Sequence, residues 1–277
     1  MSYSAFVICN CFKEGKTTEP PHKEFLKFDD DGLYLDVPIE IWEKDEERTF
    51  QMESDFEEWK RTSCEHEDME LAYEHLSNES GMGAFKKIIQ QLGGKNKFPV
   101  LTNYLPIANG GILPSEFSQL ALNELELIEQ ANISEKRINL IEKSTGELLA
   151  TTDLESYSIF SFFDVNKRYG IDKNGFFILE IETKNDENVA YVMFRSNNFI
   201  QKRVSQETIK FTDKETGKHY FSTHEIKPFY SEVKSDILEF SLEFETVKVA
   251  DYYKFMIEPL KILTKASIAS GNPIHWT

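Results

Sequence analysis

The sequence predicts an α+β protein. A mostly helical N-terminal α+β portion is followed by a β-rich antiparallel portion, which a C-terminal helix closes. Three observations lead to this fold class: helical periodicity dominates before residue 134, strand-like runs with turn signals follow it, and residues 250–269 return to the helical period. No proline- or glycine-rich linker lies near residues 132–137, so the acidic portion 1–134 and the β-rich portion 135–277 can share one core.

The N-terminal portion is expected to begin with a strand. Residues 3–12 are rich in β-branched and aromatic side chains, and residues 25–41 alternate around a turn, as in a hairpin. Capping or apolar patterns predict four helices after these strands. The first helix follows the capping-box pair Ser54 and Glu57. The second covers residues 69–76, the third covers residues 85–92, and the fourth runs from Pro114 to about Asn132.

Beyond residue 134 the pattern is that of antiparallel strands. Two segments surround Thr-Gly turns and predict hairpins, which pair 137–142 with 148–154 and 209–213 with 219–226. Further apolar and β-branched runs predict single strands. These cover residues 157–163, 175–183, 189–195 and 237–249.

The net charge of −17 is concentrated in the first half of the chain. Residues 1–136 hold 27 acidic and 13 basic side chains, whereas residues 137–277 hold 21 and 18. Because neither half is basic, we expect no binding to nucleic acid and none to an anionic membrane. The chain has no apolar run long enough to span a membrane and no signal-peptide pattern at its start, so we expect a cytoplasmic protein.

All three cysteines lie in two short motifs, Cys9-Asn10-Cys11 and Cys64-Glu65-His66. Three thiolates and an imidazole are the ligand types and the number that a closed tetrahedral zinc site needs. On a regular strand, side chains two residues apart lie about 6–7 Å from each other. Two sulfurs on one zinc ion lie only about 3.8 Å apart. A structural zinc site on Cys9, Cys11, Cys64 and His66 therefore requires a bulge or a strand end at Asn10.

Two other interpretations of the same cysteines stay open. The cysteines can be small apolar core residues, because free cysteine is among the most buried residue types. Alternatively, Cys11 or Cys64 can be a nucleophile beside His66, in a cysteine hydrolase, or the whole group can serve a metal-dependent hydrolase. The acidic neighbours of Cys64 disfavour a reactive thiolate at that position.

A strongly acidic stretch covers residues 40–79, with 15 acidic and four basic side chains. Such a stretch is typical of a solvated helical face, or of acidity that serves only solubility. Interleaved aromatic side chains favour a third interpretation, a docking surface for a basic protein, in which charge speeds the encounter and rings anchor the complex. The residues expected to contact such a partner are Trp42, Glu46, Glu47, Asp55, Glu58, Trp59, Glu65 and Asp68.

Four stretches of the chain resemble a group of uncharacterised bacterial proteins. They are the motifs CNC at 9–11, CEH at 64–66, NGG at 109–111 and GNPIHW at 271–276. The resemblance implies a bacterial origin and no activity. Because no catalytic signature is present, our leading hypothesis is a non-catalytic protein-binding or inhibitor protein. Its most concrete version is an immunity protein that neutralises a basic toxin, and the alternative is the hydrolase described above.

Overall fold

The computed structural model describes residues 2–29, 32–107, 110–164, 166–184, 187–230 and 235–277. It contains both helices and antiparallel sheets, which confirms the α+β class. The chain divides into two compact units, of which unit 1 is Met1–Ile133 with Val249–Thr277 and unit 2 is Ser134–Lys248. Among the described residues, no helix is both long and apolar enough to cross a membrane.

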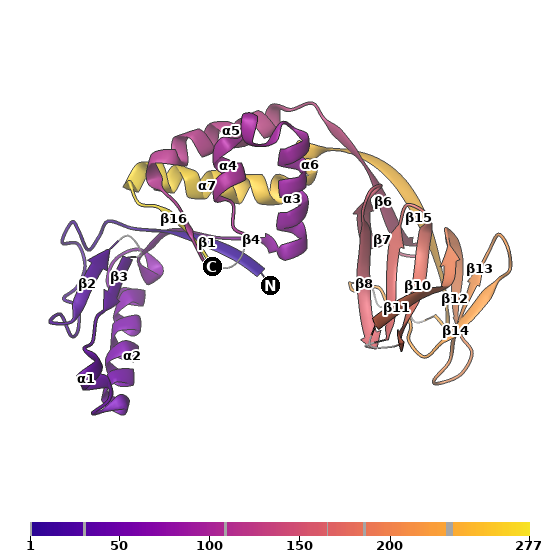
Figure 1. The fold of residues 1–277 in the computed structure, drawn as a ribbon, viewed down its shortest axis with the longest axis horizontal. Coiled ribbons are helices and arrows are strands. Elements are labelled where there is room, and N and C mark those ends of the chain that lie inside the picture. The colour runs from indigo at the N-terminus through magenta and orange to yellow at the C-terminus, as the bar shows by residue number, and fades with distance from the viewer. Residues whose placement is uncertain (1, 30–31, 108–109, 165, 185–186, 231–234) are drawn as a thin grey trace. The chain divides into compact units, whose positions relative to one another are not determined.

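Unit 1 contains a four-stranded antiparallel sheet in the order β4-β1-β16-β5 (Figure 1). Its strands are β1 (Ser2–Ile8), β4 (Glu70–Asn78), β5 (Ile112–Leu113) and β16 (Ile274–Trp276). In the register of β1 with β16, Val7 lies opposite Ile274, so segments from both ends of the sequence meet at the centre of this sheet.

Helices cover one side of this sheet and bury the larger core of unit 1 (Figure 1). They are α3 (Glu79–Gln91), α4 (Pro99–Tyr104), α5 (Ser118–Gln130), α6 (Val249–Tyr252) and α7 (Lys254–Ser270). Phe85, Leu125 and Leu260 are fully buried together in this core. The C-terminal helix therefore belongs to unit 1, and the sequence-based boundary that joined it to the β-rich portion differs from the structure on this point.

The predicted helix over residues 69–76 is wrong, because this segment is strand β4. Asp68 and Met69 have φ values of 52° and 60°, a left-handed conformation that cannot start an α-helix. After Met69 the chain is extended and pairs with β1, where Tyr73 lies opposite Phe6. The apolar spacing that predicted a helix also fits a strand of which only part is buried.

A smaller group of elements surrounds the two cysteine motifs, and we call residues 9–69 the cysteine lobe. It contains β2 (Leu26–Asp29), β3 (Gly32–Leu35), α1 (Ile39–Trp42) and α2 (Glu46–Thr62). Helix α2 begins eight residues before the predicted Ser54, because the carboxylate of Asp45 accepts a 3.1 Å hydrogen bond from the amide of Arg48 and caps it. The lobe has its own apolar core, which includes Phe56, Trp59 and Met69.

Unit 2 consists of antiparallel strands in a four-stranded sheet, β11-β10-β9-β8, and a six-stranded sheet, β14-β13-β12-β15-β6-β7. The strands of the first sheet are β8 (Tyr157–Asp164), β9 (Lys167–Asp172), β10 (Gly175–Lys184) and β11 (Glu187–Ser196). Those of the second are β6 (Ser134–Glu142), β7 (Glu147–Asp153), β12 (Asn198–Arg203), β13 (Ile209–Asp213), β14 (His219–Ser222) and β15 (Ile237–Lys248). Both predicted hairpins are confirmed as β6–β7 and β13–β14.

Aromatic side chains from both sheets form the core of unit 2. The ring of Phe176 on β10 stacks on that of Phe199 on β12, with their centroids 4.4 Å apart. Tyr169 and Phe211 contact the same pair from β9 and β13. Unit 2 thus has an apolar core of its own, distinct from the two clusters of unit 1.

Candidate metal centre

The first cysteine motif lies in a turn at the end of β1. The strand ends at Ile8, and the amide of Lys16 then donates a 2.8 Å hydrogen bond to the carbonyl of Cys11. The amide of Glu14 also donates a 2.9 Å hydrogen bond to the carbonyl of Asn10, so the motif lies in a compact turn. A metal site requires a bulge or strand end at Asn10, and the strand ends two residues before it.

The second motif follows the C-terminus of α2. The amide of Thr18 donates a 2.9 Å hydrogen bond to the carbonyl of Ser63, which fixes the end of the helix beside the first turn. Two residues after His66, the left-handed pair Asp68 and Met69 begins and reverses the chain into β4. The amide of Cys9 donates a 2.8 Å hydrogen bond to the carbonyl of Met69, so the two motifs are joined directly through the backbone.

These turns bring the four predicted ligand side chains together. The sulfurs of Cys9 and Cys64 are 3.8 Å apart, and Nδ1 of His66 lies 3.3 Å from the sulfur of Cys11 and 3.9 Å from that of Cys64. All four ligand atoms lie within 4.8 Å of one another. For a tetrahedral zinc ion with Zn–S near 2.3 Å and Zn–N near 2.0–2.1 Å, we expect S···S of about 3.8 Å and S···N of about 3.6 Å. The group is close enough to bind a metal and its geometry is compatible with zinc.

Burial changes the ionisation of the thiols in the site. Burial raises the pKa of the Cys9 thiol to about 12, and it also raises the pKa of the Cys11 thiol. The neighbouring sulfur of Cys64 adds to both shifts. Without a metal, these thiols are therefore protonated at neutral pH, and a divalent cation would ionise them. The raised pKa values oppose the interpretation of Cys11 as a free thiolate nucleophile.

Trp59, which we predicted to contact a partner, belongs instead to the wall of the metal centre. Its side chain is 9% exposed, and its indole N–H donates a 2.9 Å hydrogen bond to the hydroxyl of Thr18. Phe56 stacks against the same ring with centroids 5.8 Å apart. The capping pattern at Ser54 did not reveal the buried face of α2, where Met52, Phe56 and Trp59 follow the helical spacing.

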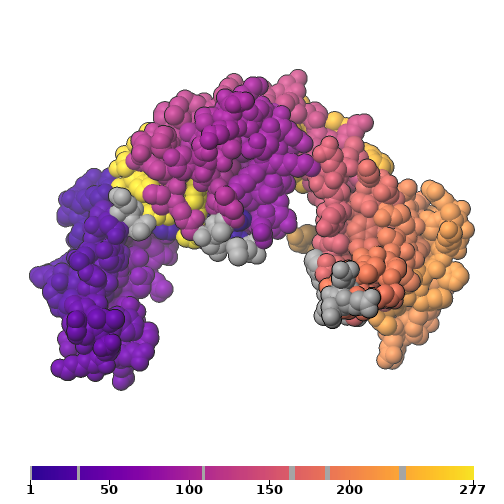
Figure 2. Space-filling view, viewed as in Figure 1, coloured from indigo at the N-terminus to yellow at the C-terminus, as the bar shows by residue number. Residues whose placement is uncertain are grey.

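The other predicted partner-binding residues lie at the surface of the lobe or close to it, and Figure 2 shows this violet part of the chain at the surface. Glu46, Glu47 and Glu58 are exposed on α2, and Glu65 is exposed between two of the ligands. Asp55 and Asp68 already contact other side chains of the lobe. Asp55 is half-buried and accepts from His22 and Gln51, and Asp68 lies 3.9 Å from the guanidinium of Arg61.

Trp42 is half-buried, and its ring meets that of Phe50 edge-on with centroids 5.4 Å apart. Phe50 is 53% exposed and is one of the aromatic side chains interleaved with the acidic stretch. Together the two rings form an aromatic pair at the N-terminal end of α2, beside the acidic side chains.

A buried asparagine network beside the first cysteine motif was not predicted as part of the site. Asn272 donates to the carbonyl of Ile8 and to the side chain of Asn10, at 2.7 and 2.9 Å. It also accepts a 3.0 Å hydrogen bond from Lys13. The C-terminal GNPIHW pattern was the available signal: Gly271, with φ 73°, ends α7 and turns Asn272 toward the motif.

The chain matches no known protein-family model, no curated protein and no solved structure. The resemblance to uncharacterised bacterial proteins therefore stays a prediction, and the function has to be argued from the geometry of the chain itself.

Proposed function

We propose that this is a non-catalytic protein-binding protein, in which a zinc-stapled lobe presents an acidic helix to a basic protein partner. One observation carries the proposal. Helix α2 leaves exposed a set of side chains that we call the acidic face: Glu46, Glu47, Glu53, Glu57 and Glu58. At 100° per residue these five lie on one continuous arc, opposite the buried Met52 and Trp59.

The acidic face is largely uncompensated within the lobe. In the described part of the chain, Glu57 is the only member that makes an ion pair, and this pair with Lys60 is long at 3.4 Å. A partner with Lys and Arg side chains would gain from this field over long range, which raises the association rate at low salt. The exposed edge of Phe50, with Trp42 behind it, supplies an apolar anchor next to the charge.

The proposed role of zinc is structural. Four protein ligands fill a tetrahedral coordination sphere, and catalytic zinc sites keep one position for water or substrate. The ligands join the start of the lobe to the end of α2, so a metal here holds the acidic face in a fixed orientation. This argument favours the binding protein over the metal-dependent hydrolase.

An immunity protein that neutralises a basic toxin is the most specific form of the proposal, because such an inhibitor must present a preformed acidic surface to its target. The hydrolase alternative makes an opposite prediction. It requires turnover of an ester or peptide substrate that His66→Ala abolishes while the rest of the protein stays folded.

The test is a charge reversal on the acidic face. A variant with Glu46→Lys, Glu47→Lys and Glu58→Lys should no longer co-purify with a basic protein from the native host. The matched control reverses three exposed carboxylates of unit 2, Glu207, Glu215 and Glu243, which changes the net charge by the same amount. Loss of the partner in both variants, or binding that is insensitive to salt, would refute a docking role for α2.

A further inference from the structure

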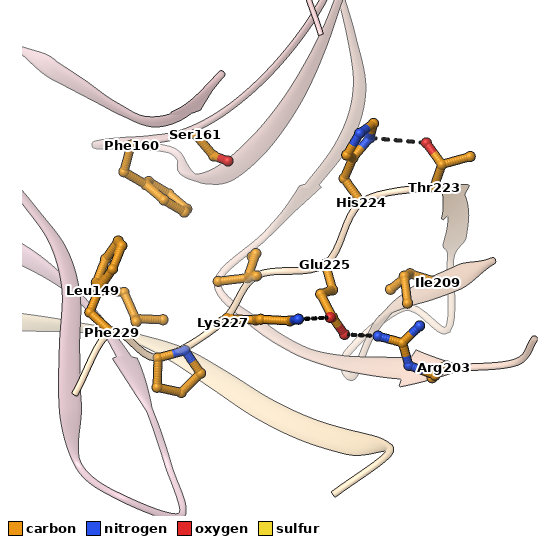
Figure 3. Close-up of a pocket in the computed structure, with 12 residues that line it drawn as sticks. Leu149, Phe160, Ser161, Arg203, Ile209, Thr223, His224, Glu225, Lys227 and Phe229 are labelled. Carbon is orange, nitrogen blue, oxygen red and sulfur yellow. Dashed lines mark hydrogen bonds and ion pairs between the residues drawn. The ribbon is translucent and has the colours of Figure 1, made fainter. Parts of the chain in front are cut away.

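A cavity of about 670 Å³ lies within unit 2 (Figure 3), whereas the metal centre and the acidic face belong to unit 1. Apolar side chains line it, among them Leu149 from β7, Phe160 from β8 and Ile209 from β13. This volume is within the range of about 300–1,000 Å³ that is typical of small-molecule sites. None of these residues takes part in the proposed protein-binding function.

One polar side chain, Ser161, faces the cavity beside its apolar lining. Ser161 is 8% exposed, and within the described residues its hydroxyl makes no hydrogen bond. Figure 3 shows its oxygen directed toward the space between Phe160 and Glu225. The hydroxyl is open to the cavity, so an oxygen of a bound ligand can replace water as its hydrogen-bond partner.

The position of Ser161 comes from irregular strand pairing. The register between β8 and β9 shifts on both sides of Ser161, between Ile159 and Ser161 and again before Asp164. On a regular strand only one of Phe160 and Ser161 would face inward, but both line the cavity. Strand irregularities of this kind re-aim side chains and are frequent beside functional sites.

A charged group lies at another side of the cavity. Glu225 forms ion pairs with Arg203 and with Lys227, the latter at 2.6 Å (Figure 3). Two cations and one carboxylate leave a local excess of one positive charge, although unit 2 as a whole holds 20 acidic and 16 basic side chains. An anionic group on a ligand would therefore be attracted to this side.

The segment that closes the cavity is fixed in place. The amide of Ile226 donates a 2.6 Å hydrogen bond to the side-chain oxygen of Gln201, whose nitrogen donates back to the carbonyl of Ile226 at 3.0 Å. Tyr169 also donates to the carbonyl of His224 at 3.0 Å. The wall is thus preformed, which reduces the entropy lost when a ligand binds.

We propose that this cavity binds a small amphiphilic carboxylate that carries a second oxygen, such as a hydroxy or oxo acid. The apolar body packs on Leu149, Phe160 and Ile209, the second oxygen bonds to Ser161, and the carboxylate lies near Arg203 and Lys227. This assignment follows from one apolar wall with two separate polar recognition points.

The probe is 12-hydroxydodecanoate, with dodecanoate and dodecanol as comparison compounds, titrated into the full chain by calorimetry. The hydroxy acid should bind more tightly than dodecanoate by about fivefold, and dodecanol should bind more weakly than either. Ser161→Ala should remove the advantage of the hydroxy acid without weakening dodecanoate. Lys227→Gln, an exposed change, should weaken both acids by about threefold and leave dodecanol unchanged.

Leu149→Trp fills the cavity, and its matched control is Leu148→Trp on the neighbouring exposed position of β7. The first should abolish binding and the second should preserve it, with circular dichroism to verify folding of both. If Leu149→Trp does not fold, the Ser161 and Lys227 variants alone test whether the cavity binds the hydroxy acid. Absence of saturable binding by any probe overturns the proposal, as do equal affinities of dodecanol and dodecanoate or an unchanged preference in Ser161→Ala.

Discussion

The side-chain amide of Asn272 donates a 2.7 Å hydrogen bond to the carbonyl of Ile8, the last residue of β1 before the first cysteine motif. The same side chain bonds to Asn10 and Lys13. We predict that Asn272→Ala lowers the free energy of unfolding by about 2–3 kcal/mol, because it leaves buried polar groups without partners. Urea unfolding measures this change. Asn123→Ala on the exposed side of α5 should change stability by less than about 0.5 kcal/mol, and equal effects would contradict the role of the network.

The metal centre makes a second prediction. The purified protein should contain about one zinc ion per chain by elemental analysis, and His66→Ala should lose it. His75, which is exposed on β4, supplies the matched control, and His75→Ala should retain the metal. Chelation should expose the amides of α2 to hydrogen exchange while those of α5 and α7 stay protected, because α5 and α7 pack in an apolar cluster separate from that of α2. A metal-free wild-type protein with a protected α2 would exclude a structural zinc site.

A third prediction concerns pH. Burial raises the pKa of Glu70 to about 7, the carboxylate of Asp68 adds to the rise, and Lys60 opposes it. The folded protein binds this proton more tightly than the unfolded chain does. The free energy of unfolding therefore falls as the pH rises from the ordinary pKa of a glutamate toward 7. Glu70→Gln should therefore stabilise the protein by about 1 kcal/mol at pH 8, and by less at pH 5.5. The same gain at both pH values would show that ionisation is not the cause.

The aromatic core of unit 2 predicts a strong dependence on Phe176. Its ring contacts those of Phe199, Phe211 and Tyr169, so Phe176→Ala should lower stability by about 3–5 kcal/mol in denaturant unfolding. Phe244 on β15 is exposed and supplies a control of the same chemistry. Its substitution by alanine should change stability by less than about 1 kcal/mol, and a comparable loss at both positions would argue against this core.

The insertion of unit 2 predicts that the two units fold separately. Ser134 and Lys248 are paired partners at the ends of β6 and β15, so the chain enters and leaves unit 2 at adjacent positions. Residues 134–248 expressed alone should give a cooperative unfolding transition and a β-type circular dichroism spectrum. The rest of the chain, joined by a short glycine-serine linker, should still bind zinc. A molten 134–248 fragment would mean that the units depend on each other.

The sequence predicted those elements that depend on residues close together in the chain. The Thr-Gly turns defined both hairpins of unit 2, because in each the carboxylate before the turn accepts from the threonine, as Glu142 does from Thr145 and Asp213 from Thr216. The ligand set of the metal centre was also predictable, because only three cysteines occur and they fall in two motifs.

Features that depend on distant contacts were not predictable. Strand β4 follows from the left-handed turn at Asp68 and from pairing with β1, and neither has a signature in the helical spacing of residues 69–76. Helix α7 joins unit 1 across an insertion, which no local pattern marks. Ser161 looked like an ordinary strand residue, since the shifts of register that place it beside the cavity appear only in the pairing with β9.

The pairing of β1 with β16 has a consequence for synthesis. On the ribosome, β1 cannot acquire this neighbour until residue 276 has been made, long after all four ligands of the metal centre have emerged. The two cysteine motifs can therefore come together, with any metal that they bind, before β16 joins β1. The order of synthesis thus lets the cysteine lobe fold before the sheet of unit 1 is complete.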